Sequence, residues 1–231
     1  IGSGAAGALN MWYESDVDAI MSRTCLRPIP TGKVKREQAL LFGIILSFIS
    51  IVMLYLSSNL ISALLLAATI SFYFFIYTIW LKRKTAQNIV IGGAAGALPP
   101  VIGWAVAMNN ISIEPVIMFL LIFIWTPSHF WALSLYKFKD YQKAKIPMLP
   151  ITAGIQKTKL NILMYAILML PVVVAPFLIG FGSIIYLILS LGMTIYYIQL
   201  CYFLLKTKTV SKSNLIARKV FVYSIFYLFF L

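Results

Sequence analysis

Apolar residues run through the chain in long blocks separated by short polar or basic segments. Six blocks are long enough to cross about 30 Å of hydrocarbon as a helix that rises about 1.5 Å per residue, and they cover residues 39–56, 60–80, 89–108, 115–136, 160–180 and 183–205. A soluble domain does not hold so many continuous apolar runs. The pattern therefore predicts an all-α fold, a polytopic bundle of transmembrane helices.

Two shorter apolar runs flank these blocks. Residues 1–9 do not begin with methionine and have the pattern of the end of a helix, whereas residues 219–231 stop part-way through a predicted span. We therefore expect a chain truncated at both termini, whose uncovered apolar faces leave the isolated 231-residue piece inactive. The longest polar segments are the loops 10–38 and 137–159, which are too short for a soluble module, so we expect one membrane domain over residues 1–231.

Composition agrees with this picture, because 61% of the residues are hydrophobic, only 11% are charged and the mean hydropathy is +0.93. The net charge of +13 raises the possibility of nucleic-acid binding, so the positions of the basic residues matter. All 19 lysines and arginines fall into four clusters: Arg23, Arg27, Lys33, Lys35 and Arg36; Lys82, Arg83 and Lys84; Lys137, Lys139, Lys143, Lys145, Lys157 and Lys159; Lys206, Lys208, Lys212, Arg218 and Lys219.

Threading the six spans alternately across the membrane places every basic cluster on one side. The links on the other side, near residues 57–59, 109–114 and 181–182, carry no base. The positive-inside rule then assigns the basic loops to the cytoplasmic side of a bacterial inner membrane, or to the matrix side of a mitochondrial inner membrane. Topology and attraction to anionic headgroups account for most of the charge, so no nucleic-acid partner is needed.

The two longest loops resemble each other. Each follows an apolar run, opens with a carboxylate (Asp18 or Asp140) and continues through a proline-containing segment, RPIPTGKVK (27–35) or IPMLPITAGIQK (146–157). Internal repeats of this kind often build a central site between two halves of a membrane protein. The prolines predict shaped rims at both loops, not simple tethers.

One predicted span carries small residues and a double proline, GGAAGALPP (92–100). Small residues let neighbouring helix backbones approach closely, and Pro99 with Pro100 should interrupt the helix. Packing and kinking explain this motif better than the close approach of a flat substrate. Cys25 and Cys201 are far apart and form no CxxC pair, so we interpret both as free thiols.

Three oxygen-bearing side chains form a stripe at the end of the first apolar run. Asn10, Glu14 and Asp18 have i, i+4, i+8 spacing and lie within an arc of about 80° on a helix, whereas Asp16 points elsewhere. Oxygen ligands with room for water and phosphate suit Mg²⁺. A helix end that simply emerges into water fits the spacing equally well, and the nearby Arg23 and Arg27 favour a diphosphate site.

Two further positions are candidates for chemistry. The basic run Lys82, Arg83 and Lys84 follows the aromatic segment YTIWL. By itself this pattern favours a basic helix end beside an aromatic belt. A clamp on a phosphate or carboxylate ligand is the alternative. His129, the single histidine, lies inside the span 115–136. An ionisable group at that depth is a functional candidate: it could ligate iron, accept a proton or simply hydrogen-bond to another helix.

Three segments together carry a family resemblance: NMWYESDVDAIMSRTCLRPIPTG (10–32), YTIWLKRKTAQNIVIGGAAGALPPVIGW (77–104) and TPSHFWALSLYKFKDYQKAKIPMLP (126–150). They cover about a third of the chain, in order, and resemble the UbiA-type intramembrane prenyltransferases, in particular the branch that acts on heme b. The resemblance implies a bundle of nine spans around a central cavity, of which this chain covers the end of the second to the start of the ninth. It also implies transfer of farnesyl from farnesyl diphosphate to a vinyl group of heme b.

The resemblance assigns roles residue by residue. Asn10, Glu14 and Asp18 match an N-x-x-x-D/E-x-x-x-D motif that binds Mg²⁺ and diphosphate, and Asp140 stands in a second acidic motif as a further metal ligand. Asp18, Asp140 and Arg27 would carry the catalysis. The matched substrate-binding positions are Asn10, Arg23, Lys82, Arg83, His129, Lys139 and Lys145.

The second motif departs from the family pattern, because Lys139 replaces a frequent acid and Lys145 stands where glycine is usual. Either lysine would then touch diphosphate directly, while His129 would lie near heme. The implied partners are farnesyl diphosphate, heme b, the lipid bilayer and, among proteins, heme A synthase or terminal-oxidase assembly proteins.

Three other functions use the same features. A prenyltransferase acting on an aromatic quinone precursor would share the acidic motif without needing TPSHFWAL (126–133). An ion-coupled transporter would also place carboxylates and a broken helix within a bundle. A non-enzymatic heme-binding protein would leave the acidic stripe without a role.

Overall fold

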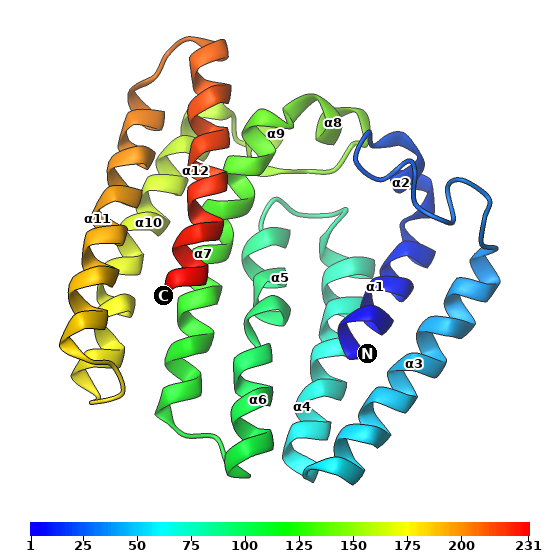
Figure 1. Cartoon of the computed structure of the whole chain (residues 1–231). Helices are drawn as coiled ribbons and strands as arrows, with labels where there is room; N and C mark the ends of the chain where they lie inside the picture. Colours follow the sequence, from blue (N-terminus) through cyan, green and yellow to red (C-terminus); the bar gives the residue numbers. More distant parts are fainter. The chain divides into compact units, whose positions relative to one another are not determined.

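The computed structural model describes all 231 residues, which form helices joined by loops, with no strand (Figure 1). Seven helical stretches are long and apolar enough to cross a membrane: α3 (Arg36–Ser57), α4 (Leu60–Ser71) with η1 (Phe72–Leu81), α5 (Asn88–Ala97) with α6 (Pro99–Met108), α7 (Ile113–Tyr136), α10 (Ile155–Leu178), α11 (Ile184–Lys206) and α12 (Val210–Phe230). Four shorter helices complete the fold: α1 (Gly2–Tyr13), α2 (Ser15–Ile20), α8 (Phe138–Lys143) and α9 (Leu149–Thr152). The predicted all-α fold is confirmed.

The last apolar run differs from its prediction. The sequence pattern predicts a span cut short over residues 219–231, but α12 begins at Val210 and continues for 21 residues. Its first turns hold polar and basic residues such as Lys212 and Arg218, which hid the start of the helix from a search for apolar blocks. The stretch is long enough to span a membrane.

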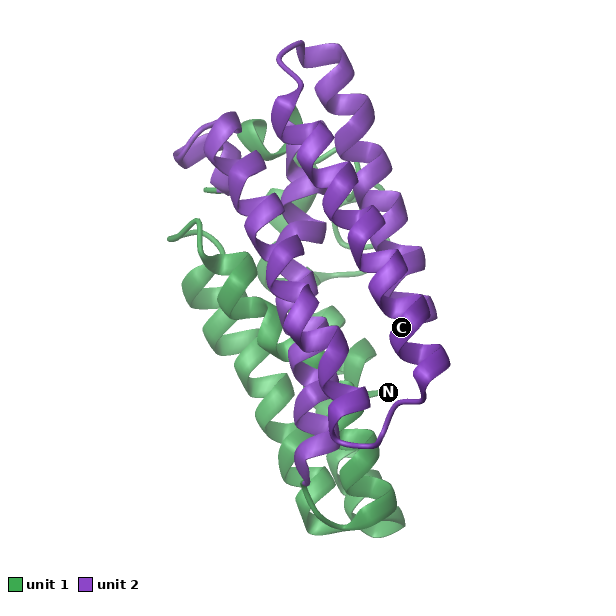
Figure 2. Cartoon of the chain, turned by 90° about the vertical axis from the view of Figure 1, so that its left-hand side faces the viewer, with its two compact units in different colours: residues 1–111, 139–147 green, residues 112–138, 148–231 purple.

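The chain forms two compact units, which Figure 2 shows in separate colours. Unit 1 consists of residues 1–111 and 139–147, and unit 2 consists of residues 112–138 and 148–231. The single domain expected over residues 1–231, and a central site between two halves, stay predictions.

In unit 1, α1 packs against α3 and η1, and α4 packs against α3 and α6. Leu9, Ile70 and Phe74 form a buried apolar cluster at the first of these contacts. Close packing of a side chain against a helix backbone occurs at α5, where a Cβ added to Gly92 would overlap the ring of Tyr77 on η1. This contact supports the packing interpretation of the small-residue motif, and the break between Ala97 and Pro99 confirms that the prolines interrupt the helix.

We expect Gly92→Ala to destabilise the protein by about 1–3 kcal/mol, because the new methyl group overlaps the Tyr77 ring and forces repacking. The matched control is Gly96→Ala in the same helix, where an added Cβ meets nothing within 4 Å. Thermal unfolding in detergent should show a lower midpoint for Gly92→Ala and an unchanged or higher one for Gly96→Ala. Equal midpoints for the two variants would contradict the close η1–α5 contact.

In unit 2, α7 packs against α10 and α12, and α11 packs against both α10 and α12. The core joins α7, α10 and α12 through Ile117, Leu121, Met169, Val173 and Tyr227. Within each unit the basic loops gather at one end of the helices, as Figure 1 shows for the segments after α2 and η1 in unit 1. The sidedness of the whole chain stays a prediction.

Candidate functional site

The predicted stripe lies where α1 meets α2. Glu14 separates the two helices with φ −98° and ψ 14°, a region of backbone conformation that active-site residues often occupy. Helical hydrogen bonds nevertheless continue across the break, from the Glu14 N–H to Asn10 O (2.9 Å) and from the Asp18 N–H to Glu14 O (2.8 Å). The three side chains therefore keep a common face. Asn10, Glu14 and Asp18 are 6%, 1% and 3% exposed, whereas Asp16 is exposed to solvent.

Glu14 is held by two donors from different elements. Its Oε2 atom accepts from Asn10 Nδ2 at 2.9 Å and pairs with Lys82 Nζ, which follows η1. Asn10 Nδ2 also lies 3.2 Å from Thr78 Oγ1. The other carboxylate oxygen, Glu14 Oε1, is buried and has no hydrogen-bond donor. The site thus contains one buried acceptor that is free to meet a cation.

The π-helix η1 positions two of these partners. Thr78 Oγ1 donates to Tyr73 O at 2.9 Å and the Lys82 N–H donates to Tyr77 O at 2.9 Å, both across five residues. The wide π turn is uncommon and often occurs at functional sites. Thr78 is not among the residues predicted from the sequence, because the aromatic run around it has no pattern that distinguishes π from α winding.

Asp18 binds the loop that follows α2. Arg27 Nη1 lies 2.7 Å from Asp18 Oδ2, and Thr24 Oγ1 donates to Asp18 O at 3.0 Å. The Asp18 side chain is nearly buried and that of Arg27 is about one-third exposed. Arg23, in contrast, is exposed and forms no ion pair. Of the two loop arginines, the structure brings only Arg27 onto the stripe.

Arg83 binds the carboxylate outside the stripe. Its guanidinium donates to both oxygens of Asp16 at 2.9 and 2.7 Å, and it lies 5.2 Å from the centre of the Tyr13 ring. This hydrogen bond lowers the pKa of Asp16 and raises the pKa of Arg83. Because both side chains are more than a third exposed, the pair contributes little to stability. Arg83 is thus fixed at the rim and not among the buried groups.

Asp140 belongs to unit 1 but not to the stripe. Its Oδ2 accepts from Ser22 Oγ at 2.6 Å, which joins α8 to the loop after α2. Lys139 and Lys145 are exposed. Lys145 has φ +53°, and the bonds Lys145 N–H to Gln142 O and Ile146 N–H to Tyr141 O complete a Schellman cap at the end of α8. Such a cap prefers glycine at the left-handed position, which explains why glycine is usual here in the family pattern. Lys145 adopts the same backbone conformation without being glycine.

The oxygen atoms of the stripe suit a divalent ion that keeps water and phosphate ligands better than an ion held by protein ligands alone. No three Asp, Glu, His or Cys side chains in the chain approach one another closely enough to form a metal cluster, and Asp140 makes its contact elsewhere. The residues that could hold such an ion are Glu14, Asp18 and the Asn10 amide, with the unpartnered Glu14 Oε1 as a buried oxygen at this place. Mg²⁺ is commonly held by one or two carboxylates, with water and substrate phosphates filling the remaining positions.

His129 lies in unit 2, in a stack of aromatic rings. The Trp125 ring on α7 lies 4.2 Å away at 21°, and the Phe221 ring on α12 lies 4.5 Å away at 26°. Ser224 Oγ lies 2.7 Å from His129 Nδ1 and donates its own proton to Phe221 O at 2.6 Å. With the serine proton directed at Phe221 O, we assign His129 the Nδ1–H tautomer, in which Nδ1–H donates to Ser224 Oγ and Nε2 carries the lone pair.

A cross-helix hydrogen bond, one of the three roles open to His129 from the sequence, is thus present, and it leaves the second ring nitrogen available. Ser224, Trp125 and Phe221 could not be predicted as its neighbours, because their relation to His129 depends on how α12 packs against α7. The remaining candidates divide between the units: the stripe, Arg27, Lys82 and Arg83 belong to unit 1, and His129 belongs to unit 2.

Comparison with known proteins places this geometry in a family. The family model described as "UbiA prenyltransferase family" matches residues 1–225. A relative from Pelagibacter ubique (strain HTCC1062), named protoheme IX farnesyltransferase, is 63% identical over 229 residues, which are 99% of this chain and 76% of that protein.

Two solved structures share the fold. One, from work on digeranylgeranylglyceryl phosphate synthase in membranes, has a TM-score of 0.79 at 19% identity and covers 98% of this chain and 78% of its own. The other is a UbiA homolog from Archaeoglobus fulgidus bound to DMAPP and Mg²⁺, with a TM-score of 0.65 at 14% identity, covering 98% of this chain and 83% of its own. Given the family match over residues 1–225 and the seven apolar helices, the chain belongs to the UbiA prenyltransferase family and is a multi-pass membrane enzyme.

Proposed function

We propose that this protein transfers the farnesyl group of farnesyl diphosphate to a vinyl group of heme b. The buried stripe of Asn10, Glu14 and Asp18, flanked by Lys82 and Arg27, carries the proposal, because it joins metal-binding oxygens to phosphate-binding cations. The name of the Pelagibacter relative supports heme and farnesyl as the substrates. The Archaeoglobus homolog, which was solved with DMAPP and Mg²⁺ bound, supports a prenyl diphosphate and Mg²⁺ at this kind of fold.

Glu14, Asp18 and Asn10 would hold the Mg²⁺ ion, which when bound supplies positive charge to the departing diphosphate. Lys82 pairs with Glu14 and Arg27 pairs with Asp18, so each base can form a charge-assisted hydrogen bond to a phosphate oxygen placed beside the stripe. Their positive charge stabilises the negative charge that grows on the leaving group as the allylic C–O bond breaks. The vinyl carbon then forms the new C–C bond, and water adds to the resulting cation beside the porphyrin and releases one proton to solvent, which leaves a hydroxyl group.

Arg23, Arg83, Lys139 and Lys145 lie outside the buried stripe, so we propose a weaker role for them. They are exposed or partly exposed basic groups, suited to attracting an anionic diphosphate or the heme propionates toward the site. Asp140 is proposed to order the rim of the site through Ser22 instead of completing the metal shell.

His129 is proposed to lie at the heme, with Nε2 directed at the iron. Ser224 fixes the ring as the Nδ1–H tautomer, which is the usual arrangement of a histidine that ligates a metal through its other nitrogen. The stacked rings of Trp125 and Phe221 prevent the imidazole from turning.

We also propose that the basic loops face the cytoplasm at a bacterial inner membrane, or the matrix in a mitochondrion, because the lysines and arginines gather at one end of each unit. The product would then pass to membrane proteins that use it, with heme A synthase and terminal-oxidase assembly proteins as candidates.

The direct test supplies the purified full-length membrane protein with heme b, farnesyl diphosphate and Mg²⁺. We expect a product heavier than heme b by one farnesyl group and one hydroxyl group, detected by mass spectrometry, and no product when Mg²⁺ is chelated. Substitution of heme b by an aromatic acid should give no prenylated product. Prenylation of the aromatic acid alone would replace this proposal with the quinone-precursor reaction, and ion flux without prenyl transfer would point to a transporter.

A further inference from the structure

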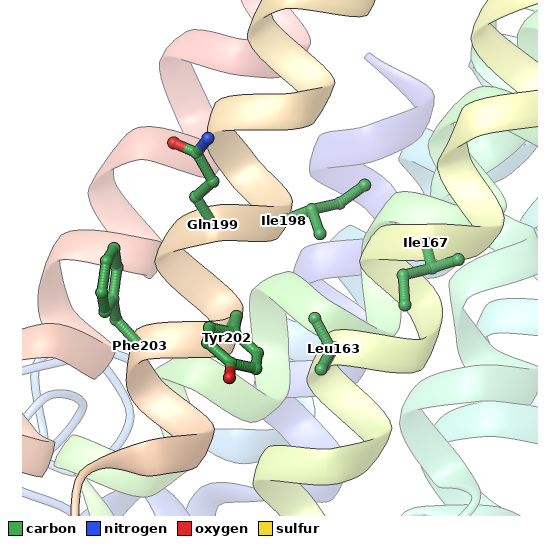
Figure 3. A pocket seen from close by; sticks show the side chains of 6 residues that line it. All are labelled: Leu163, Ile167, Ile198, Gln199, Tyr202 and Phe203. Carbon is green, nitrogen blue, oxygen red and sulfur yellow. The ribbon is translucent and has the colours of Figure 1, made fainter.

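A groove runs between α10 and α11 on the surface of unit 2. A cavity of about 470 Å³ is lined by Leu163 and Ile167 on α10 and by Ile198, Gln199, Tyr202 and Phe203 on α11. Figure 3 shows the α10 side chains facing Ile198 and Tyr202. Its lining is almost entirely apolar, and both helices are long enough to cross a membrane. In a bilayer, the natural occupant of such a groove is an acyl chain.

A second hollow lies one turn along the same two helices. It has a volume of about 530 Å³ and is lined by Gln156, Lys157 and Leu160 on α10 and by Leu205 and Lys206 on α11. Lys159, which is buried, donates to Thr207 O at 2.7 Å and so ties the start of α10 to the end of α11. The groove therefore ends at a mouth that carries two lysines, Lys157 and Lys206.

The mouth carries positive charge that the protein does not neutralise. Unit 2 contains eight lysines and arginines but a single acidic side chain, Glu114. Glu114 stands in the first turn of α7, a helix of 24 residues, so about 30 Å or more separates it from the end that holds the mouth. Lys157 and Lys206 form no ion pair, and Lys206 Nζ lies 5.5 Å from the centre of the Tyr202 ring that lines the groove.

Unit 1 shows the contrast. Its Arg27, Lys82 and Arg83 each pair with a carboxylate of the same unit. The lysines at the α10–α11 mouth have no such partner. The N-terminus of α10 beside Lys157 adds positive potential and the C-terminus of α11 beside Lys206 adds negative potential, so the net charge of the mouth comes from the two lysines. An anionic lipid headgroup would complement this charge.

We propose that this groove binds one anionic phospholipid, with its phosphate between Lys157 and Lys206 and one acyl chain along Leu160, Leu163 and Ile167. The exposed amide of Gln199 lies seven residues, or about 10 Å, below Lys206 along α11. An amide in that position needs a hydrogen-bond partner in the bilayer, and the ester carbonyls of a lipid provide one. The groove shares no residue with the acidic stripe, and it does not depend on the proposed reaction.

The first test removes the charge. Phosphatidylglycerol and phosphatidylcholine with identical acyl chains are titrated into the detergent-purified protein, and binding is measured by native mass spectrometry. We expect one phosphatidylglycerol to bind more tightly than phosphatidylcholine. The double variant Lys157→Gln, Lys206→Gln should lose about fivefold in affinity per lysine, or roughly 25-fold in all. Lys208→Gln with Lys212→Gln, two lysines that do not line the groove, is the matched control and should change affinity by less than about threefold.

The second test fills the groove and leaves the charge unchanged. Ile167→Trp places a bulky ring in the acyl channel and should weaken phosphatidylglycerol binding, whereas Leu168→Trp, an exposed neighbour outside the lining, should not. If Lys157→Gln, Lys206→Gln and Lys208→Gln, Lys212→Gln lose equal affinity for phosphatidylglycerol, the attraction of anionic lipid is diffuse and the proposal is overturned. Unchanged binding in Ile167→Trp would overturn the acyl groove, and equal affinity for the two lipids would overturn the headgroup site.

Discussion

Replacement of Asp18 by alanine is expected to lower farnesyl transfer by at least about 100- to 1,000-fold, the range seen when one preorganised charge-stabilising group is lost from an active site. Asp18 is 3% exposed, supplies one of the two carboxylates of the stripe and holds Arg27 at 2.7 Å. Its loss therefore removes a ligand for the divalent ion and releases the arginine that would meet the phosphate. Steady-state formation of farnesylated heme measures the effect.

Two companion variants separate chemistry from folding. Asp16→Ala lies two residues away on the same short helix, but its side chain is exposed and outside the stripe, so we expect activity within a few-fold of the unchanged protein. Asp18→Asn keeps the size of the side chain and should raise the Mg²⁺ concentration needed for half-maximal rate. Because Arg27 is about one-third exposed, water can solvate it after the substitution, so the fold should survive. Full turnover by Asp18→Ala would remove Asp18 from the metal site.

The acidic stripe could be predicted from sequence because its geometry is local. Four-residue spacing fixes Asn10, Glu14 and Asp18 on one face whatever the rest of the chain does, and the burial of all three alongside an exposed Asp16 follows from it. The apolar blocks predicted the spans for a similar reason, since a bilayer requires about 20 apolar residues per helix. The first turns of α12 are polar and include Lys212. The search for apolar blocks therefore placed the start of this helix too late.

Arg27 and Lys82 are among the residues predicted for the site, but their contacts with the stripe could not be predicted, because these contacts depend on tertiary packing and on unusual helix winding. Lys82 reaches Glu14 across 68 residues through the π turns of η1, which no pattern in the aromatic run indicates. Asp140 stood in an acidic motif, but only the folded chain shows that it contacts Ser22. The role of Lys145 is likewise set by a left-handed backbone at the end of α8, a property of the cap and not of the side chain.

Substitution of His129 is expected to weaken the binding of heme without changing the binding of farnesyl diphosphate. His129→Ala should lose heme-dependent turnover, with a fall of at least about 10- to 100-fold in heme affinity, while farnesyl diphosphate binding stays unchanged. The reason is geometric: Nδ1 is held by Ser224, both ring faces are stacked, and Nε2 is the remaining atom that can bind a ligand. Heme binding is measured by optical titration, and diphosphate binding by retention of radiolabelled farnesyl diphosphate.

Ser224 provides the sharper version of this experiment, because it acts on heme only through the histidine. Ser224→Ala leaves Nδ1 without its acceptor and frees the tautomer, so heme affinity should fall by about 10- to 100-fold and the absorption spectrum of the bound heme should shift. Ser224→Thr retains the hydroxyl and should restore both the heme affinity and the spectrum.

Ser190→Ala, which removes a buried hydroxyl on α11 bonded to Leu187 O, is the matched control for a general loss of stability. If Ser190→Ala weakens heme binding as much as Ser224→Ala, or if His129→Ala binds heme with an unaltered spectrum, the imidazole packs unit 2 and does not ligate iron.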